Sequence, residues 1–355
     1  MKIAITVSQV TPGGGLTKYV CTLTDILTSD LQNEVWVITT HQSESNPTLE
    51  GLKENRKVSI ISLGHLTTIR KYISLTMLLR RISPDLLIVN YNAPTQYVLP
   101  LLPRKIKTVH ILHNNTPDFY RVAAINGNRT TAWIAPTPAL AHCFDEYTHH
   151  TYSERIATIP HGVEFPLSRC QKGNSPLQLS YVGVLYEHKG VKILPAVIKR
   201  LVSTGHKFHF TFIGDGILRG ELEQALQKEM ASDIVKFTGR ISGHEVYECL
   251  SRSDIFVYPT HIDAFGLVIA EAMINGAVPI VTRLEGITDS LIDNEIDGFL
   301  VTQDDVDSFV ERITRLMDNP TLRSQMSAAA TYKANTKFSI DTMRKNYIDC
   351  IHKLV

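Results

Sequence analysis

Apolar residues along this chain follow two alternating patterns. Short apolar runs rich in β-branched residues, typical of buried strands, are separated by longer segments whose apolar residues recur every three or four positions, as in helices. In the first half of the chain the predicted strands are residues 3–7, 34–39, 58–62, 86–90, 108–112, 132–135 and 156–159. Strands that alternate with helices predict a parallel sheet with helices on both faces.

The alternation stops at residues 162–178, which contain two prolines and an Asn-Ser pair but no long apolar run. We interpret this segment as a linker. The alternation then restarts, with predicted strands at residues 179–183, 208–213, 235–238, 254–260 and 277–282. The sequence therefore predicts an α/β protein with two similar domains, residues 1–165 and 166–338, and a ligand site in a cleft between them.

Composition excludes several classes of protein. A chain of 355 residues suits two domains, and its net charge of +1 gives no sign of a nucleic-acid partner. The five cysteines are scattered and form no Cys-x-x-Cys, so we expect reduced thiols in a cytoplasmic protein. The first residues read as a strand rather than a signal peptide, and no run of about 18 apolar residues predicts a membrane-spanning helix.

The stretch from residue 261 to residue 276 holds the strongest candidate chemistry. It lies between the predicted strands 254–260 and 277–282, and residues 265–275 suit a helix that ends at a glycine. A junction between the carboxyl end of a parallel strand and the start of a helix is where α/β proteins commonly bind ligands.

Two carboxylates flank bare backbone amides in this stretch. Asp263 lies just before the predicted helix, and Glu271 lies about two turns along it. We expect the N–H groups of Phe265, Gly266 and Leu267 to be free to face an anion, and the glycine to let that anion approach closely. This arrangement suits a ligand with both hydroxyls and phosphates. The alternative is an Asp that only caps the helix and a Glu that is ordinarily exposed.

Two further candidate sites follow strands of the first half. Pro12-Gly13-Gly14-Gly15 comes after the first strand and opens a helix, where small residues let backbone amides meet an anion. The glycines match neither the dinucleotide fingerprint nor a P-loop, and a tight turn with no ligand is the alternative. His113-Asn114 ends the strand 108–112, again at the expected cleft, unless it is merely a polar strand end.

These residues carry a resemblance. The segment Asp263-Ala-Phe-Gly-Leu-Val-Ile-Ala-Glu271 resembles the acidic-x7-Glu motif of the retaining glycosyltransferases of family 4, although the first acid of that motif is usually Glu. The segment from Tyr181 to Gly190 resembles the family's Val-Gly-Arg-Leu-x-x-x-Lys-Gly, in which the lysine binds the donor diphosphate. Lys189 matches that lysine, whereas Val184 stands in place of the arginine, and His188 or Arg240 would have to supply the missing cation.

The resemblance implies a GT-B fold: two Rossmann-like domains that face a central cleft, with a last helix, residues 339–355, that returns to pack on the first domain. It implies a UDP- or GDP-sugar donor, a glycan or lipid-linked acceptor and no metal cofactor. Glu271 would hold the ribose, Lys189 and the amides of the 263–271 motif the diphosphate, and Arg240 would lie near the base. The implied donor-binding residues are Gly14, Gly15, Lys189, Gly190, Arg240, Phe265, Gly266, Leu267 and Glu271, and the implied catalytic residues are His113 and Asp263.

The resemblance favours a glycosyltransferase of bacterial surface polysaccharide synthesis over three rivals. A nucleotide-sugar 2-epimerase of the same fold would change its sugar without an acceptor. A catalytically weak nucleotide-binding subunit would fit Val184 and the shortened Asp263. A dinucleotide oxidoreductase would need the glycine fingerprint that is missing.

Two other patterns have simpler interpretations. Asp305-Val-Asp307 fits the metal-binding Asp-x-Asp, but its place at a predicted helix start favours capping acids, and no His/Cys cluster has metal-ligand spacing. Residues 65–82 carry an apolar stripe among arginines and lysines. We favour a domain helix with a basic outer face, and a helix that contacts an anionic membrane, at its inner face, is the alternative.

Overall fold

The computed structural model divides the chain into two compact units. Unit 1 comprises residues 1–162 and 340–355, and unit 2 comprises residues 163–339. The first boundary precedes residue 165 because Val163 pairs with Ser339 in a short bridge and donates its N–H to the Phe338 carbonyl, both in unit 2. The structure describes residues 1–10, 14–29, 33–41, 52, 57–165 and 176–354.

Unit 1 is built on a sheet of seven parallel strands in the order β3-β2-β1-β4-β5-β6-β7. Most strand residues are apolar and buried on both faces of the sheet, as expected when helices cover both sides of a parallel sheet. The order reverses between β1 and β4, where Val7 pairs with Asn90. The strands are β1 Lys2–Val7, β2 Glu34–Thr39, β3 Val58–Ser62, β4 Leu86–Asn90, β5 Lys107–Ile111, β6 Ala132–Ala135 and β7 Ile156–Thr158.

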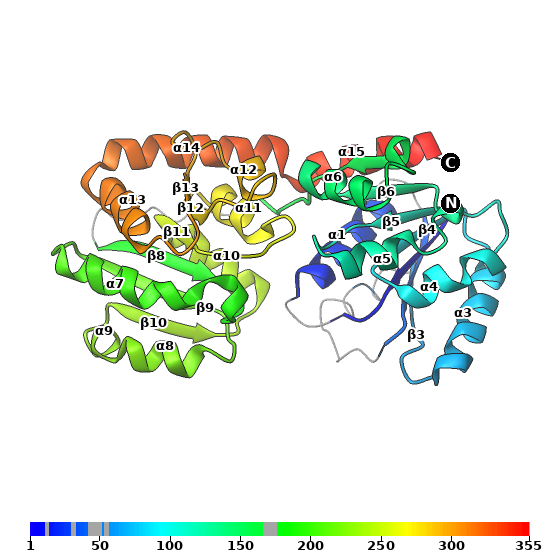
Figure 1. Cartoon of the computed structure of the whole chain (residues 1–355), viewed down its shortest axis with the longest axis horizontal. Coiled ribbons are helices and arrows are strands. Elements are labelled where there is room, and N and C mark those ends of the chain that lie inside the picture. The colour runs from blue at the N-terminus through cyan, green and yellow to red at the C-terminus, as the bar shows by residue number, and fades with distance from the viewer. Residues whose placement is uncertain (11–13, 30–32, 42–51, 53–56, 166–175, 355) are drawn as a thin grey trace. The chain divides into compact units, whose positions relative to one another are not determined.

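The helices of unit 1 follow these strands, and Figure 1 shows them around the sheet. They begin where the sequence offers a helix start: Asn92 caps α4 through the Thr95 N–H, and Thr137 caps α6 through the Leu140 N–H. The helices are α1 Gly15–Ser29, α3 Thr68–Ile82, α4 Ala93–Val98, α5 Pro117–Ala124, α6 Pro138–Tyr147 and α15 Ile340–Leu354.

Unit 2 repeats the plan with six parallel strands in the order β10-β9-β8-β11-β12-β13. Its order reverses between β8 and β11, the counterpart of the reversal in unit 1. The strands are β8 Leu177–Val182, β9 Phe208–Ile213, β10 Val235–Gly239, β11 Ile255–Tyr258, β12 Val278–Thr282 and β13 Phe299–Val301. The helices are α7 Leu194–Ser203, α8 Arg219–Ala225, α9 Gln227–Ala231, α10 Gly243–Arg252, α11 Leu267–Ile274, α12 Thr288–Leu291, α13 Val306–Asp318 and α14 Pro320–Lys337.

The expected strands are all present, within one or two residues of their predicted ends in most cases. The helix expected at residues 265–275 is shorter, because Gly266 has a left-handed conformation (φ 83°) and α11 starts only after it. Asp305 caps α13 by accepting the Ser308 N–H, as the capping interpretation predicted. Most of the predicted linker, residues 166–175, and the loop residues 11–13 lie outside the described residues.

The C-terminal helix α15 packs in the core of unit 1. Met343, Tyr347 and Ile351 are buried among side chains of β1, α1 and neighbouring strands. The Tyr347 hydroxyl shares a hydrogen bond with the hydroxyl of Tyr19 on α1. In the described part of the chain, no helix is long and apolar enough to cross a bilayer.

The buried ring of Tyr347 should therefore matter more than its hydroxyl. We expect Tyr347→Ala to lower the free energy of unfolding by about 3–5 kcal/mol, because it leaves a cavity and strands the Tyr19 hydroxyl. The matched control Tyr347→Phe keeps the ring and should cost only about 1–2 kcal/mol. Denaturant unfolding followed by circular dichroism measures both, and equal losses would contradict this account of how α15 is held.

Candidate functional site

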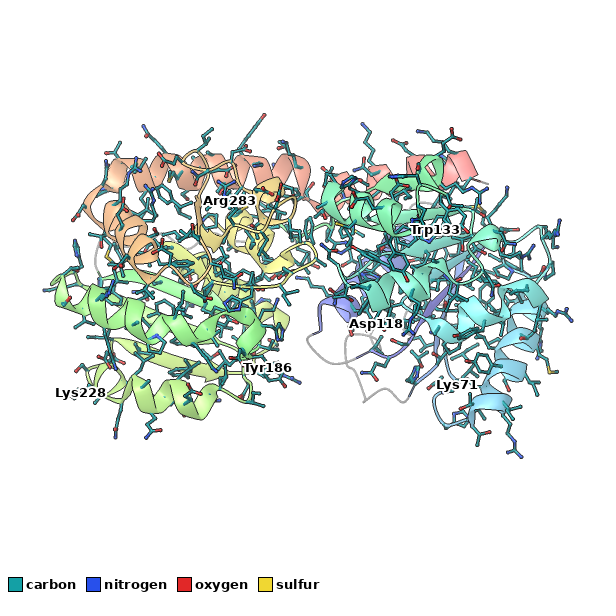
Figure 2. The ribbon with its side chains drawn as sticks, viewed as in Figure 1. Lys71, Asp118, Trp133, Tyr186, Lys228 and Arg283 are labelled. Carbon is teal, nitrogen blue, oxygen red and sulfur yellow. The ribbon has the colours of Figure 1, made fainter. Side chains whose placement is uncertain are left out.

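The candidate site of unit 2 lies at the carboxyl ends of β8 and β11, where the strand order reverses. In a parallel sheet the loops diverge at such a point and leave a crevice for a ligand. The loop after β8 ends in a short 3-10 helix, Glu187–Lys189, and the loop after β11 carries Asp263. Figure 2 labels Tyr186, which comes directly before the 3-10 helix.

Gly190 lets these two loops lie against each other. Its φ is +66°, and a Cβ built on it would lie 1.8 Å from the Pro259 carbonyl oxygen. The His261 N–H donates to the His188 carbonyl at 3.0 Å beside this contact. A side chain at position 190 would therefore push the lysine loop away from the end of β11.

The contact brings two of the predicted residues together. Lys189 Nζ lies 3.0 Å from Asp263 Oδ2 and also donates to the Ile262 carbonyl at 3.1 Å. The Tyr258 hydroxyl donates to the same carboxylate oxygen at 2.8 Å. Only 17% of each charged side chain is exposed, so water screens this ion pair weakly.

The other oxygen of Asp263 occupies the amides that were expected to face a ligand. Its Oδ1 accepts the N–H groups of Ala264 at 2.8 Å, Phe265 at 3.3 Å and Gly266 at 2.9 Å. The prediction that the Phe265 and Gly266 amides are free is therefore wrong for this structure, because the carboxylate folds back onto them. In the described part of the chain the amide of Leu267, the first residue of α11, still lacks an acceptor.

The pKa of Asp263 reflects a balance of opposing effects. Burial removes water from the carboxylate and raises its pKa, but the nearby Lys189 charge and the hydrogen bonds from Lys189, Tyr258 and Ala264 outweigh burial. The net result is a pKa below the usual 3.8, so the acid is ionised at neutral pH. Burial and this carboxylate together raise the pKa of Tyr258 well above 10, which keeps its hydroxyl as a donor.

Glu271 and Arg240 occupy opposite environments. Glu271 lies on α11 and is buried, so it is not the ordinary exposed Glu of the alternative interpretation. Arg240 follows β10 and is exposed, with the Asp215 carboxylate near enough to feel its charge. Asp215 is also bound by Arg219 at 3.1 Å.

No second cation is provided by His188. Val184, at the position of the family's arginine, is 39% exposed and lends only its carbonyl to the Tyr181 hydroxyl. Burial and the Lys189 charge lower the pKa of His188 below 6.5, which leaves it neutral at pH 7. The expectation that His188 replaces the missing cation is therefore not supported by its surroundings.

Unit 1 holds the remaining predicted residues, Gly14, Gly15 and His113. Gly15 begins α1, and a Cβ built on it would meet nothing within 4 Å, so its surroundings are open. His113 lies two residues beyond β5 and its Nε2 is 2.8 Å from Oδ1 of Asn90, the last residue of β4. The centroids of the His113 and Tyr19 rings are 4.9 Å apart in a T-shaped arrangement.

His113 is a neutral imidazole in this setting. Burial and the neighbouring His161 and His110 hold its pKa well below 6.5. With Oδ1 of Asn90 facing Nε2, the arrangement assigns the proton to Nε2 and leaves Nδ1 as an acceptor. A sugar hydroxyl is a suitable donor to such a nitrogen.

Sequence reasoning missed the residues that hold Asp263 and His113. Tyr258 and Asn90 each end a buried apolar strand with a polar group, which is the signal that could have identified them. Tyr19, by contrast, lies inside the helical pattern of α1 and looks like an ordinary core residue. Within the described ranges, no three His, Cys, Asp or Glu side chains are grouped to hold a metal ion.

Loss of Lys189 should reverse the direction in which the Asp263 pKa is shifted. With Lys189→Met the effect of burial is left with less opposition, so we expect the Asp263 pKa to rise above 3.8. The wild-type carboxylate adds stability above its unfolded pKa of about 3.9, and this is lost as the pH falls through its lower folded pKa. In the variant, the free energy of unfolding should instead fall as the pH rises from 4 to 7. At pH 7 it should be about 3–5 kcal/mol lower than that of the wild type.

Carboxyl 13C chemical shifts measured against pH and denaturant unfolding at each pH test this expectation. Lys189→Arg is the control, because it keeps the charge and should keep the Asp263 pKa low. A pKa that stays below 3.8 in Lys189→Met would show that the lysine does not hold the carboxylate ionised.

Comparisons with known proteins agree with this geometry. Residues 170–333 match the family model described as "Glycosyl transferases group 1", and residues 13–165 match "Glycosyltransferase Family 4". An uncharacterized glycosyltransferase of Methanocaldococcus jannaschii is 28% identical over 68% of both chains. A phosphatidylinositol N-acetylglucosaminyltransferase subunit of Schizosaccharomyces pombe is 30% identical over 39% of this chain, and a glycogen synthase of Mycobacterium tuberculosis is 26% identical over 53% of it.

The alignments cover 31% of the S. pombe protein and 46% of the glycogen synthase, so the chain spans less than half of those relatives. Solved structures of Anabaena Alr3699/HepE with UDP and with UDP-glucose align over the whole of both chains, with TM-scores of 0.82 and 0.81 and 18% identity, which shows a shared fold. Together the two family models span most of both units, and the chain belongs to the family 4 glycosyltransferases of the GT-B fold.

Proposed function

We propose that this chain moves a sugar from a nucleotide-diphosphate sugar to a hydroxyl of a glycan or lipid-linked acceptor, with retention at the anomeric carbon. The observation that carries the proposal is the Lys189–Asp263 pair beside the unoccupied amide of Leu267. A cation, a carboxylate and a helix N–H at one strand end match the phosphates and hydroxyls of such a donor. The UDP-glucose-bound Anabaena structure supports the same class of ligand.

Donor binding would rearrange the ion pair. The diphosphate would take Lys189 Nζ and the Leu267 N–H, because two phosphate charges attract the ammonium more strongly than one carboxylate does. Asp263, still held by Tyr258 and three amides, would then accept hydrogen bonds from the sugar. Glu271 would bind the ribose hydroxyls, and Arg240 would border the base of UDP or GDP.

The proposed reaction needs no protein nucleophile. The acceptor oxygen would bond to the anomeric carbon on the face from which the diphosphate leaves, and the acceptor proton would pass to a phosphate oxygen of the leaving group. Lys189 and the amide at the start of α11 would stabilise the negative charge that collects on that diphosphate. His113, neutral and proton-free at Nδ1, would position a sugar hydroxyl rather than supply a charge.

One observation favours a second candidate function. Val184 and the neutral His188 leave Lys189 without a second cation at either of these two positions of the loop after β8. A chain that binds the nucleotide but transfers slowly, as an assembly subunit, would have such a site. A 2-epimerase would instead release free nucleotide and a changed sugar when no acceptor is present.

Three substitutions test the proposed function. Glu271→Ala should weaken UDP or GDP binding roughly tenfold or more in calorimetry, because two ribose hydroxyls lose their acceptor.

Lys189→Ala should lower the transfer rate more than it weakens nucleoside binding, since the charge develops during bond breaking. Asp263→Ala should abolish transfer.

The control is Lys192→Ala, which removes an exposed lysine that pairs only with Glu187 near the same loop. It should leave nucleotide binding and turnover unchanged. Transfer by Asp263→Ala at the wild-type rate would refute the catalytic role of that acid, and unchanged affinity in Glu271→Ala would refute its ribose role. Turnover of a UDP- or GDP-sugar without any acceptor would favour the epimerase.

We further propose that α3 contacts an anionic membrane, where a lipid-linked acceptor would lie. The helix buries Leu75, Leu79 and Ile82 and turns the expected apolar stripe outward, so the prediction of a domain helix with a purely basic outer face is wrong. Ile69, Ile73 and Met77, spaced one turn apart, are 74%, 55% and 66% exposed. Arg70, Arg80 and Arg81 are also exposed on α3, whereas Lys71 is only partly exposed, and α3 contains no acid; Figure 2 labels Lys71 on the helix.

Both features favour an anionic bilayer, because apolar side chains gain by leaving water and each nearby cation adds about 1 kcal/mol. Replacing Ile69, Ile73 and Met77 together by Ser should lower binding to phosphatidylglycerol-containing vesicles more than tenfold in co-sedimentation. The control Ile296→Ser removes an equally exposed apolar side chain in unit 2 and should have no effect. Equal binding by the triple variant would rule out this surface.

A further inference from the structure

The described loop residues at the carboxyl edge of the unit 1 sheet carry no formal charge. Among the described residues between each strand and the helix or chain segment that follows it, none is Asp, Glu, Lys or Arg. These residues are 8–10 and 14, 40–41, 63–67, 91–92, 112–116, 136–137 and 159–162. The corresponding edge of unit 2 contrasts with this, since its loops carry Lys189, Arg240 and Asp263.

Charge decides which ligands such an edge can hold. A phosphate or a carboxylate that leaves water is held most strongly by a cationic side chain, and a cationic ligand by an acid. Side-chain amides, hydroxyls and neutral imidazoles suit uncharged hydroxyl groups. The described loops of unit 1 offer side chains of only this second kind, including the imidazole of His113.

An aromatic pair stands at the centre of this edge. Tyr91 comes directly after β4, and its ring stacks on Phe119 of α5 with centroids 3.8 Å apart and planes 15° from parallel. Both side chains are partly exposed. Figure 2 labels Asp118, the residue that precedes Phe119 on α5.

The backbone of Tyr91 is strained to place this ring. Its φ is +40°, a left-handed conformation that a non-glycine residue adopts at a cost of about 1–2 kcal/mol. Hydrogen bonds of both neighbouring residues hold this backbone conformation. The Asn90 side chain is hydrogen-bonded to His113 at 2.8 Å, and Asn92 caps α4 and donates to Thr40 at 2.9 Å. Strain kept at a strand end indicates a function for the side chain, because glycine would fit the same backbone without that cost.

We propose that Tyr91 and Phe119 form the platform of an acceptor subsite for an uncharged sugar residue. One face of the sugar ring would pack its C–H groups on the negative face of the aromatic ring, and its hydroxyls would meet His113 and the amide side chains of the adjoining loop. The described loops bring no Lys or Arg to this platform, which favours an uncharged sugar over a sugar acid or a phosphorylated sugar. This inference rests on the proposed function, in which unit 2 takes the donor.

Saturation-transfer NMR on the full chain tests the subsite. The probes are methyl pyranosides of glucose, galactose, mannose and N-acetylglucosamine, each against the matched uronide or 6-phosphate where one exists. We expect at least one neutral glycoside to receive saturation on the C–H protons of one ring face, and the charged sugars to receive much less. Binding of none of the neutral glycosides, or equal binding of the charged ones, would overturn the proposal.

Three variants assign the effect to Tyr91. Tyr91→Phe keeps the ring and should keep the signal, whereas Tyr91→Ala should weaken binding about tenfold. Tyr91→Gly removes ring and strain together, so its thermal midpoint should equal or exceed that of Tyr91→Ala while sugar binding stays lost. Undiminished saturation transfer in Tyr91→Ala would show that the sugar does not bind this platform. Octyl glucoside serves as a further probe, and saturation of its alkyl chain alone would show that the platform binds apolar groups rather than sugar.

UDP and GDP titrations on the same samples separate this inference from the proposed function. Nucleotide binding without glycoside binding would overturn the subsite and leave the donor site standing. Glycoside binding without nucleotide binding would leave the subsite standing and contradict the transferase. All Tyr91 variants should bind nucleotide as the wild type does.

Discussion

A carboxylate taken out of water must be paired, and this constraint shapes the candidate site. Asp263 lies at a strand end with little exposure, and it is held by one lysine, one tyrosine and three successive amides. Gly190 is required because only a residue without Cβ allows the lysine loop to approach the end of β11. The ion pair thus depends on a glycine that has no chemistry of its own.

The pair also keeps the charges of Lys189 and Asp263 compensated before any ligand binds. In the structure, Asp263 occupies the place at Lys189 that a phosphate oxygen would take, and it fills the amides before α11 itself. A donor diphosphate would exchange with the carboxylate at Lys189 rather than meet a bare cation. The cost of separating Lys189 from Asp263 is then set against a stronger attraction to two phosphates, which favours ligands with a diphosphate over those with a single charge.

The two units use the same strand order for opposite chemistry. Loops at the carboxyl edge of unit 2 carry charged groups, whereas the described loops at the carboxyl edge of unit 1 carry amides, hydroxyls, imidazoles and an aromatic pair. An activated donor is charged at its leaving group, and an acceptor sugar is a neutral polyol. The difference in charge between the described loops of the two units therefore fits the proposal that unit 2 takes the donor and unit 1 the acceptor.

Sequence pattern predicted the strands, the repeated α/β plan and the junction at Asp263, because these depend on local apolar runs and on one motif. It failed where the answer depends on side-chain direction. Asp263 turns back onto the amides of Phe265 and Gly266, and α3 exposes the apolar stripe that the pattern suggested it would bury. The stacking of Tyr91 on Phe119 joins residues from two elements, and no spacing along the chain announces it.

A crystal structure of the chain grown with UDP or GDP tests the central claim most directly. The account predicts the diphosphate within hydrogen-bonding distance of Lys189 Nζ and the Leu267 N–H, with Lys189 withdrawn from Asp263. A nucleotide bound away from this strand–helix junction, or bound while the Lys189–Asp263 pair remains intact, would contradict it.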